Sequence, residues 1–427
     1  MSKLGLGRGF FKLDFDWKLK NVPDRVFFYL LAASLLLRII WLDKPPGSLI
    51  FDEKYYVNVA RIIVGLPHDP DVYQDAPLGV DPNHEHPPLA KLFIALSVSL
   101  LGNNPYGFRL PSVIFGTISI FIFYLLMKKI SKRPTLSLIA TFLFSFDNLV
   151  FVHSRIATLD IFVLAFLLLG FYWYFDKKTV LSAVAFALAT LCKVGGLYGV
   201  ATILAYHFFH NIHLWRSGRE RIDWKTRLGW LERFSIVYGV SLLGLLLILD
   251  RAWGGYANPI DHIVFIYNYT RALTRDVPAG IESYPWQWLM NQIQIPYLTV
   301  NVDVYADKVL TGSYAAVAFV GAMNPLIIYL CIPSMAYMAY TYYEKKDNFA
   351  LFTLLWFACT YLPFYPMSIF WHRISYIFYF LNTVPAVCIA IAYMLLDQKP
   401  PKIVIALYLL AVLAGFYMLF PFKTVPS

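Results

Sequence analysis

The chain has little charge for its length. Only 15% of its 427 residues are charged and 59% are hydrophobic, whereas a soluble globular protein usually carries about 25% charged residues. The mean hydropathy is +0.58. Apolar runs of about 18 residues or more, long enough to cross a bilayer as a helix, recur along the sequence. This composition excludes an ordinary soluble domain and predicts an all-α polytopic membrane protein.

The sequence also lacks the patterns of a disulfide framework or a metal site. The four cysteines have no paired spacing and lie in or beside apolar runs. They are Cys192, Cys331, Cys359 and Cys388. A His-Glu-His sequence ends at His86, but it lies in a proline-rich loop and matches no standard ligand spacing. We therefore expect neither a metal nor a cofactor besides the substrate.

A cleavage pattern is missing after the first apolar run, so we expect this run to remain as the first span. The net charge is +10, and the basic residues cluster in short segments between apolar runs. We interpret these clusters as cytoplasmic segments that contact lipid headgroups, not as a nucleic-acid surface. Residues 1–25 then form a cytoplasmic tail, followed by about eleven spans. The spans are expected near residues 26–43, 110–127, 134–152, 157–175, 179–192, 195–212, 234–251, 325–343, 349–366, 373–396 and 402–420.

The whole chain, 1–427, is then one transmembrane domain with two long outer loops, 44–109 and 252–324. The apolar segment Leu89–Leu101 is short, and we expect it to form an interfacial or partly re-entrant helix on the outer face. Function usually resides in long loops on a rigid scaffold. We therefore expect the functional site at the outer end of the spans.

Two adjacent acids, Asp52 and Glu53, begin the first outer loop soon after the first span. They are either simple solvated charges or a general base placed where the headgroup of a lipid substrate lies. His86, further along the same loop, is expected to help clamp a substrate at the start of the interfacial helix. Arg38, within the first span, needs a partner, and Asp52 or Glu53 is the expected one.

Basic residues also fall at the expected outer ends of several spans. Arg109, Lys193 and Arg373 can either snorkel to lipid phosphate or bind the phosphate of a substrate. Arg155 and Asp160 flank the start of the fourth expected span, and they could join Asp147 in a structural ion-pair cluster or take part in an active site. A base, several phosphate-binding cations and access from the bilayer together suit sugar transfer from a polyprenyl phosphate.

A series of short motifs occurs in order along residues 25–420. The motifs are Phe51-Asp52-Glu53; the run from His86 to Lys91; Arg109-Leu110-Pro111 with Gly116; Phe146 to Leu149; Ser154-Arg155 with Leu159-Asp160; Lys193 with Gly196-Leu197; Ser283 to Trp286; Asn324 to Leu326; and Arg373 with the run from Tyr376 to Pro385. In this order they resemble the protein O-mannosyltransferase family. The resemblance implies a GT-C fold with eleven spans.

The resemblance also implies a reaction. Family members move mannose from a dolichyl or polyprenyl phosphate to Ser or Thr hydroxyls of proteins, with inversion at the anomeric carbon. By this resemblance Asp52 is the expected base, and Arg109 helps to hold the donor phosphate. Glu53, His86, Arg155, Asp160, Lys193 and Arg373 are expected to line the same site. The loop 252–324 is too short for the β-trefoil domain of the eukaryotic members, which favours a compact prokaryotic enzyme of the cell membrane.

Three other functions remain open at this point. A related GT-C enzyme would use the same scaffold to glycosylate a lipid or a glycan. A transporter would place its charges near the middle of the bilayer, often on broken helices, whereas the charges here fall at the ends of spans. A purely structural membrane protein would leave the outer charges unexplained.

Overall fold

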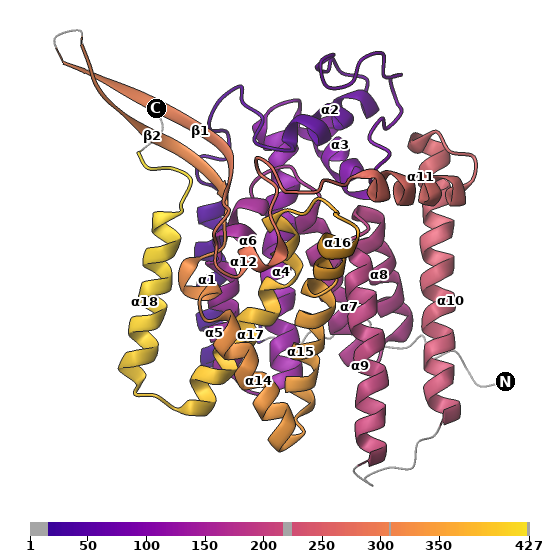
Figure 1. The fold of residues 1–427 in the computed structure, drawn as a ribbon, viewed down its shortest axis with the longest axis vertical. Helices are drawn as coiled ribbons and strands as arrows, with labels where there is room; N and C mark the ends of the chain where they lie inside the picture. Colours follow the sequence, from indigo (N-terminus) through magenta and orange to yellow (C-terminus); the bar gives the residue numbers. More distant parts are fainter. Residues whose placement is uncertain (1–15, 217–223, 307–308, 425–427) are drawn as a thin grey trace.

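The computed structural model describes residues 16–216, 224–306 and 309–424. Most of these residues form helices that run along one axis of the molecule (Figure 1). The first fifteen residues of the expected cytoplasmic tail lie outside the described part of the chain. The long helices are α1 (Val22–Ile39), α4 (Pro105–Ser131), α5 (Pro134–Ser145), α7 (Asp160–Phe175), α8 (Thr179–Cys192), α9 (Gly196–Arg216), α10 (Trp224–Leu249), α14 (Cys331–Lys345), α15 (Asn348–Tyr361), α17 (Val384–Gln398) and α18 (Lys402–Met418).

Three helical segments are long and apolar enough to cross a membrane by themselves: Pro105–Ser131, Leu228–Gly254 and Asn348–Phe370. The second of these includes most of α10, which stands at the side of the bundle (Figure 1). Only 11% of its most apolar window is buried within the protein, and large side chains such as Ile236 and Val240 are exposed. An apolar helix exposed in this way needs an apolar surrounding, which lipid provides. The helices therefore support an integral membrane protein.

One end of the bundle gathers the basic segments. Lys128, at the end of α4, forms an ion pair with Asp24 at the start of α1, with 3.0 Å between Nζ and Oδ1. Lys129 contacts Asp176 after α7 at 2.6 Å. Lys345, at the end of α14, contacts Asp397 of α17 at 2.9 Å. Segments far apart in the sequence thus meet at one end, which we call the basic end.

The opposite end, which we call the loop end, carries shorter elements (Figure 1). These are α2 (Glu53–Ile63), α3 (Leu89–Leu101), α6 (Asn148–His153), a π-helical turn η1 (Asp250–Gly254), α11 (Pro259–Ala272), α12 (Pro285–Trp288), α13 (Pro325–Ile328), α16 (Phe364–Phe370) and a 3-10 helix η2 (Ile377–Asn382). Helix α3 has 13 residues, about 20 Å at 1.5 Å per residue. It packs against α2 at the loop end (Figure 1), which fits the expected interfacial helix.

The prediction of an all-α protein is wrong in the second long loop. There β1 (Ile295–Ala306) and β2 (Val309–Gly321) form a two-stranded antiparallel hairpin. The hairpin projects beyond the helices at the loop end (Figure 1). Its register shifts at three places along the pairing, so the strands are not ideal partners throughout. A prediction that rests on long apolar runs misses such strands, because their apolar residues alternate with polar ones.

Several predicted spans are also interrupted. The span expected at 134–152 breaks between α5 and α6, where Asp147 caps α6 by accepting a hydrogen bond from the Val150 N–H. In the span expected at 373–396, the α-helix begins only at Val384. The residues before it form an extended segment and the 3-10 helix η2. These interruptions place polar backbone at the loop end, where the candidate site lies.

Candidate active site

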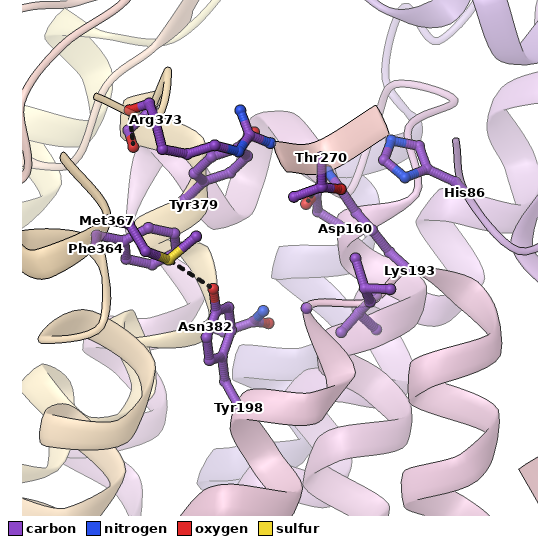
Figure 2. Close-up of a pocket in the computed structure, with 14 residues that line it drawn as sticks. His86, Asp160, Lys193, Tyr198, Thr270, Phe364, Met367, Arg373, Tyr379 and Asn382 are labelled. Carbon is purple, nitrogen blue, oxygen red and sulfur yellow. Dashed lines mark hydrogen bonds and ion pairs between the residues drawn. The ribbon is translucent and has the colours of Figure 1, made fainter. Parts of the chain in front are cut away.

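A pocket at the loop end is lined by residues from five separate parts of the chain. Figure 2 shows His86 and Arg373 pointing into the cavity from opposite sides, with Asp160 and Thr270 between them. Tyr198, Phe364, Met367 and Asn382 lie below. The full lining is His86, Asp160, Val163, Lys193, Val194, Gly195, Tyr198, Thr270, Phe364, Met367, Arg373, Ser375, Tyr379 and Asn382.

Lys193 and Asp160 form the charged pair of this pocket. Nζ of Lys193 donates to Oδ1 of Asp160 at 2.9 Å. Lys193 follows the last residue of α8 in an extended conformation, and the chain then turns into α9 at Gly196. A side chain at Gly196 would collide with the backbone of Ala189 and Thr190, so glycine allows the tight turn that presents the lysine. The ammonium also lies 5.2 Å from the ring centroid of Phe378.

Three buried polar atoms of the pocket residues have no hydrogen-bond partner in the described structure: Nδ1 of His86, Nε of Arg373 and Oδ1 of Asn382. A buried polar group without a partner costs free energy, about 1–3 kcal/mol each. Another nitrogen of the same guanidinium, Nη1 of Arg373, donates to the backbone carbonyls of Ile374 and Leu273. These two hydrogen bonds fix the side chain. The pocket therefore holds oriented donors and acceptors that a polar ligand can satisfy.

His86 is neutral in this setting. Burial lowers the pKa of His86 well below its usual value, and the nearby charges of Lys193 and Lys91 lower it further. A neutral imidazole can donate or accept one hydrogen bond at a ligand, but it adds no positive charge. The positive charge facing a ligand in the pocket therefore comes from Lys193 and Arg373.

Asp52 lies just before α2, where its carboxylate interacts electrostatically with Lys193 and Asp160. Burial raises the pKa of Asp52 to about 6; Asp160 and Glu85 add to the rise, and Lys193 and Lys54 oppose it. No hydrogen bond reaches this carboxylate from the residues that the structure describes. A carboxylate that is desolvated and lacks a hydrogen-bond donor is suited to accept a proton near neutral pH.

Glu53 and Arg109 form a buried pair next to Asp52. Nε and Nη2 of Arg109 donate to the two carboxylate oxygens of Glu53, each at 2.9 Å. The remaining donors reach the backbone carbonyls of Leu42, Lys44 and Ser48. Every N–H of Arg109 is thus used within the protein. This arrangement favours a role in shaping the loop before Asp52 over the predicted contact with a donor phosphate.

Glu53 also ties the loop to the rest of the site. Its Oε1 accepts from the backbone N–H of Ala157 at 2.9 Å, three residues before Asp160. Its Oε2 accepts from the N–H of Ile50 at 2.8 Å. Glu53 is fully buried. It therefore joins the Asp52 loop to the segment that carries Asp160.

Of the two alternatives left open for Asp147, Arg155 and Asp160, the ion-pair cluster does not form among the described residues. Arg155 instead donates to the carbonyls of Leu37 and Ile40 at the end of α1. These carbonyls lack partners within the helix and carry its partial negative charge, so a guanidinium is well placed there. Asp147 caps α6 and accepts from the N–H of Asn324 at 3.1 Å.

The expected partner of Arg38 is wrong as well. Arg38 donates to the hydroxyl and carbonyl of Ser34, and to the carbonyl of Ser145 at 3.4 Å. Its guanidinium lies 5.1 Å from the ring centroid of Phe151. An arginine in the last turn of a helix can thus be held by backbone carbonyls, a hydroxyl and an aromatic ring, without either acid of the Asp52–Glu53 pair.

The loop that carries His86 is built around Lys91. The buried ammonium of Lys91 lies 2.6 Å from Oδ2 of Asp81 and donates to the carbonyl of His86 at 2.8 Å. It also donates to the backbone carbonyl and side chain of Asn83. The sequence motif from 86 to 91 contains this lysine, but its role as the centre of the loop was not predicted.

A second support comes from the other long loop. His262 of α11 contacts Oδ1 of Asp250 through Nδ1 at 2.7 Å and the carbonyl of His84 through Nε2 at 2.9 Å. The backbone N–H of Asp81 donates to the carbonyl of Trp253 at 2.6 Å. We call this set of contacts the His262 clamp. No sequence pattern links these positions, since they are brought together only by the fold.

Comparisons with known proteins bear on the family and the fold. A sequence model of the family described as dolichyl-phosphate-mannose-protein mannosyltransferase matches residues 85–249. The chain is 23% identical to a polyprenol-phosphate-mannose–protein mannosyltransferase of Mycolicibacterium smegmatis, over 92% of this chain and 88% of that protein. It is also 23% identical to the enzyme of the same description in Corynebacterium glutamicum, over 81% and 77% of the two chains.

The fold has matching solved structures. A protein O-mannosyltransferase complex of S. cerevisiae bound to its sugar donor superimposes with a TM-score of 0.70 at 12% identity, covering 96% of this chain and 91% of that chain. ArnT from Cupriavidus metallidurans bound to undecaprenyl phosphate gives 0.56 at 16% identity, covering 88% and 61%. The matched family model, the curated relatives and the fold thus all make this chain similar to dolichyl- or polyprenol-phosphate-mannose–protein mannosyltransferases.

Proposed function

We propose that the protein transfers mannose from a polyprenyl or dolichyl phosphate to Ser or Thr hydroxyls of proteins, with inversion at the anomeric carbon. The acceptor oxygen attacks the anomeric carbon and its proton passes to the carboxylate of Asp52. The bond from the anomeric carbon to the phosphate oxygen breaks, and the lipid phosphate leaves with the electron pair. The observation that carries this proposal is the group of unpartnered polar atoms in the pocket, beside Lys193 and near Asp52.

Each part of the pocket suits one part of such a donor. Lys193 and Arg373 supply the positive charge for the phosphate, which gains charge as it leaves. Asn382 and the neutral His86 suit sugar hydroxyls or phosphate oxygens, because each offers a free hydrogen-bonding atom. The proposal assigns no metal to the reaction. The apolar and aromatic side chains of the lining, Val163, Val194, Tyr198, Phe364 and Met367, suit the first prenyl units.

The remaining site residues act by positioning in this proposal. Asp160 holds Lys193 through their 2.9 Å contact. Arg109 and Glu53 shape the loop that presents Asp52, and Arg155 joins the end of α1 to the segment before α7. We therefore keep the term catalytic for Asp52 and assign Glu53, Arg109 and Arg155 structural support of the site.

The topology belongs to the same proposal. Eleven helices run along the bundle, and we propose that they are the eleven spans of one transmembrane domain. The basic segments meet at one end, and short basic loops favour the cytoplasmic side. The loop end with the pocket then faces outward in a prokaryotic cell membrane. The charged residues of the pocket come from the ends of helices and not from their middles, which differs from the pattern of a transporter.

A transfer assay tests the function directly. Purified protein in nanodiscs receives radiolabelled polyprenyl phosphate mannose and a Ser/Thr-rich peptide, beside Asp52→Asn protein. We expect label on the peptide with the unaltered protein only. Label on an added lipid or glycan, and none on the peptide, would show that the acceptor is that lipid or glycan and not a protein. Normal turnover by Asp52→Asn would remove Asp52 as the base.

A further inference from the structure

The hairpin of β1 and β2 has one occupied and one open edge. Near its base, the outer edge of β2 pairs with the end of the described chain: the N–H of Ala318 donates to the carbonyl of Pro421 at 2.7 Å, and that of Lys423 to Ala316 at 2.8 Å. Phe422 forms the corresponding bridge with Val317. Within the part of the chain that the structure describes, β1 makes backbone pairs only with β2. Its outer edge therefore presents unpaired N–H and C=O groups.

The open edge carries few of the features that usually protect such a strand: its pairing with β2 has three register shifts, but it has no lysine, and no proline beyond its base. Folded proteins block exposed edges with lysines, prolines or bulges that turn the edge away. β1 contains 12 residues with neither Lys nor Arg, and its one proline, Pro296, lies at the base. Beyond the base, Thr299, Asn301 and Asp303 alternate with valines, and Val302 and Val304 are more than 40% exposed. A weakly protected edge of this kind favours pairing with another extended chain.

The end of β1 nearest the helices lies close to Asp52, the residue proposed to accept the proton. The ring of Tyr297 stacks on Phe51, the residue before Asp52, with 4.1 Å between ring centroids. The hydroxyl of Tyr297 lies 2.9 Å from Nε2 of His153, whose Nδ1 lies 4.0 Å from Asp160. A chain that follows the edge of β1 toward its base is thus led to Asp52.

We propose that an extended segment of the acceptor polypeptide binds along the open edge of β1 as an added strand, which places its Ser or Thr beside Asp52. This inference rests on the proposed function, because it assumes a polypeptide acceptor. An added strand is recognised mainly through its main chain, so many different sequences can be accepted. The pocket proposed for the lipid-linked donor includes Asp160, which lies 4.0 Å from His153 next to the base of β1, so the two proposed binding sites adjoin.

Backbone recognition has a signature that side-chain recognition lacks. In a strand, the N–H groups of alternate residues point to the same side. We would synthesise a series of acceptor peptides with a single Ser, each carrying one N-methyl group at a successive position beside that Ser. Initial rates with polyprenyl phosphate mannose and the full-length protein in nanodiscs give KM and kcat for each peptide.

We expect KM to rise at every second position, by about three- to tenfold for each lost hydrogen bond, with kcat little changed. A second measurement uses cysteine variants of the two strands, Thr299→Cys on β1 and Ser313→Cys on β2, with a peptide that carries a cysteine near its Ser. Both side chains are exposed, but Ser313 pairs with Asp303, nearer the tip than Thr299; Asp303→Cys on β1 is therefore linked in parallel as the variant matched to Ser313→Cys. We expect the disulfide to the peptide to form with Thr299→Cys and Asp303→Cys, and much less with Ser313→Cys.

The outcomes separate the two proposals. Transfer to the unmethylated peptide supports the proposed function, whatever the methyl series shows. If that transfer occurs but KM shows no alternation, or Ser313→Cys is linked as readily as Asp303→Cys, the edge of β1 is not the acceptor site. Disulfides between two copies of Thr299→Cys protein, with no link to the peptide, would show that the edge pairs with a second copy instead. Absence of transfer to any peptide would overturn the proposed function itself.

Discussion

At the scale of single residues, the first prediction concerns Asp52. Burial raises its pKa to about 6, and only the ionised carboxylate can accept the acceptor proton. Transfer should therefore fall as the pH decreases through about 6, by close to tenfold per pH unit on the acid side. The pH dependence of kcat at saturating donor measures this limb.

The matched control is Glu85→Gln, because the charge of Glu85 also raises the pKa of Asp52. Removing that charge should move the acid limb to lower pH and leave the maximal rate unchanged. An acid limb at the same pH in both proteins would contradict the electrostatic link between the two residues.

The neighbouring acid should behave differently. Glu53 pairs with Arg109 and is fully buried, so Glu53→Gln leaves a buried guanidinium without its counter-charge. Breaking one partner of a buried pair typically costs about 3–5 kcal/mol. We expect a clear loss of thermal stability in detergent for Glu53→Gln, and almost none for Asp52→Asn.

Thermal unfolding followed by tryptophan fluorescence distinguishes the two acids. Asp52→Asn should be inactive but stable, whereas Glu53→Gln should lose stability together with activity. Equal stability of both variants would show that the Glu53–Arg109 pair does not support the loop.

At the scale of elements, the His262 clamp joins α11 to the loop that carries His86. His262→Ala removes the contact with the carbonyl of His84 and leaves Asp250 without its partner. The loop should then hold His86 less firmly, and we expect the donor KM to rise by about tenfold. Initial rates at varied donor concentration measure this effect.

Asn268→Ala provides the control on the same helix, because Asn268 is exposed. It should leave the donor KM unchanged. A similar rise in both variants would indicate a general effect on α11, and the clamp would lose its specific role.

Most of the helices could be predicted from the sequence. The apolar runs predicted the long helices. The short apolar segment Leu89–Leu101 predicted that α3 differs from the spans. The hairpin was missed because the alternation of polar and apolar residues in β1 produces no long run. The Lys91-centred loop and the His262 clamp were missed for another reason: Asp250 and His84 are distant in sequence, and only the fold brings them together. Arg109 was predicted to bind the donor phosphate, because the sequence does not show that Glu53 and backbone carbonyls accept hydrogen bonds from all of its N–H groups.

At the scale of the whole molecule, the proposed orientation predicts which surfaces are accessible. The base of the hairpin and the pocket should face outward, and the segment around Lys399 after α17 should face the cytoplasm. Thr299→Cys should react with an impermeant maleimide added to intact cells, and Lys399→Cys only after permeabilisation. Unaltered protein is the background control, since three of the four native cysteines are buried. Labelling in the reverse pattern would invert the topology.

The position of α10 has a consequence for the lipid environment. The apolar segment Leu228–Gly254 has 27 residues, about 40 Å at 1.5 Å per residue, which is longer than a hydrocarbon core of about 30 Å. Hydrophobic mismatch of this size is relieved by tilting, and α10 packs on the bundle along one side only, mainly against α8. Asp250 lies where this segment reaches the loop end, and it contacts His262, so a change of tilt should move the support of His86. Bilayer thickness should thus tune donor affinity: the donor KM measured in vesicles of increasing acyl length should pass through a minimum, and in His262→Ala protein it should lose that dependence.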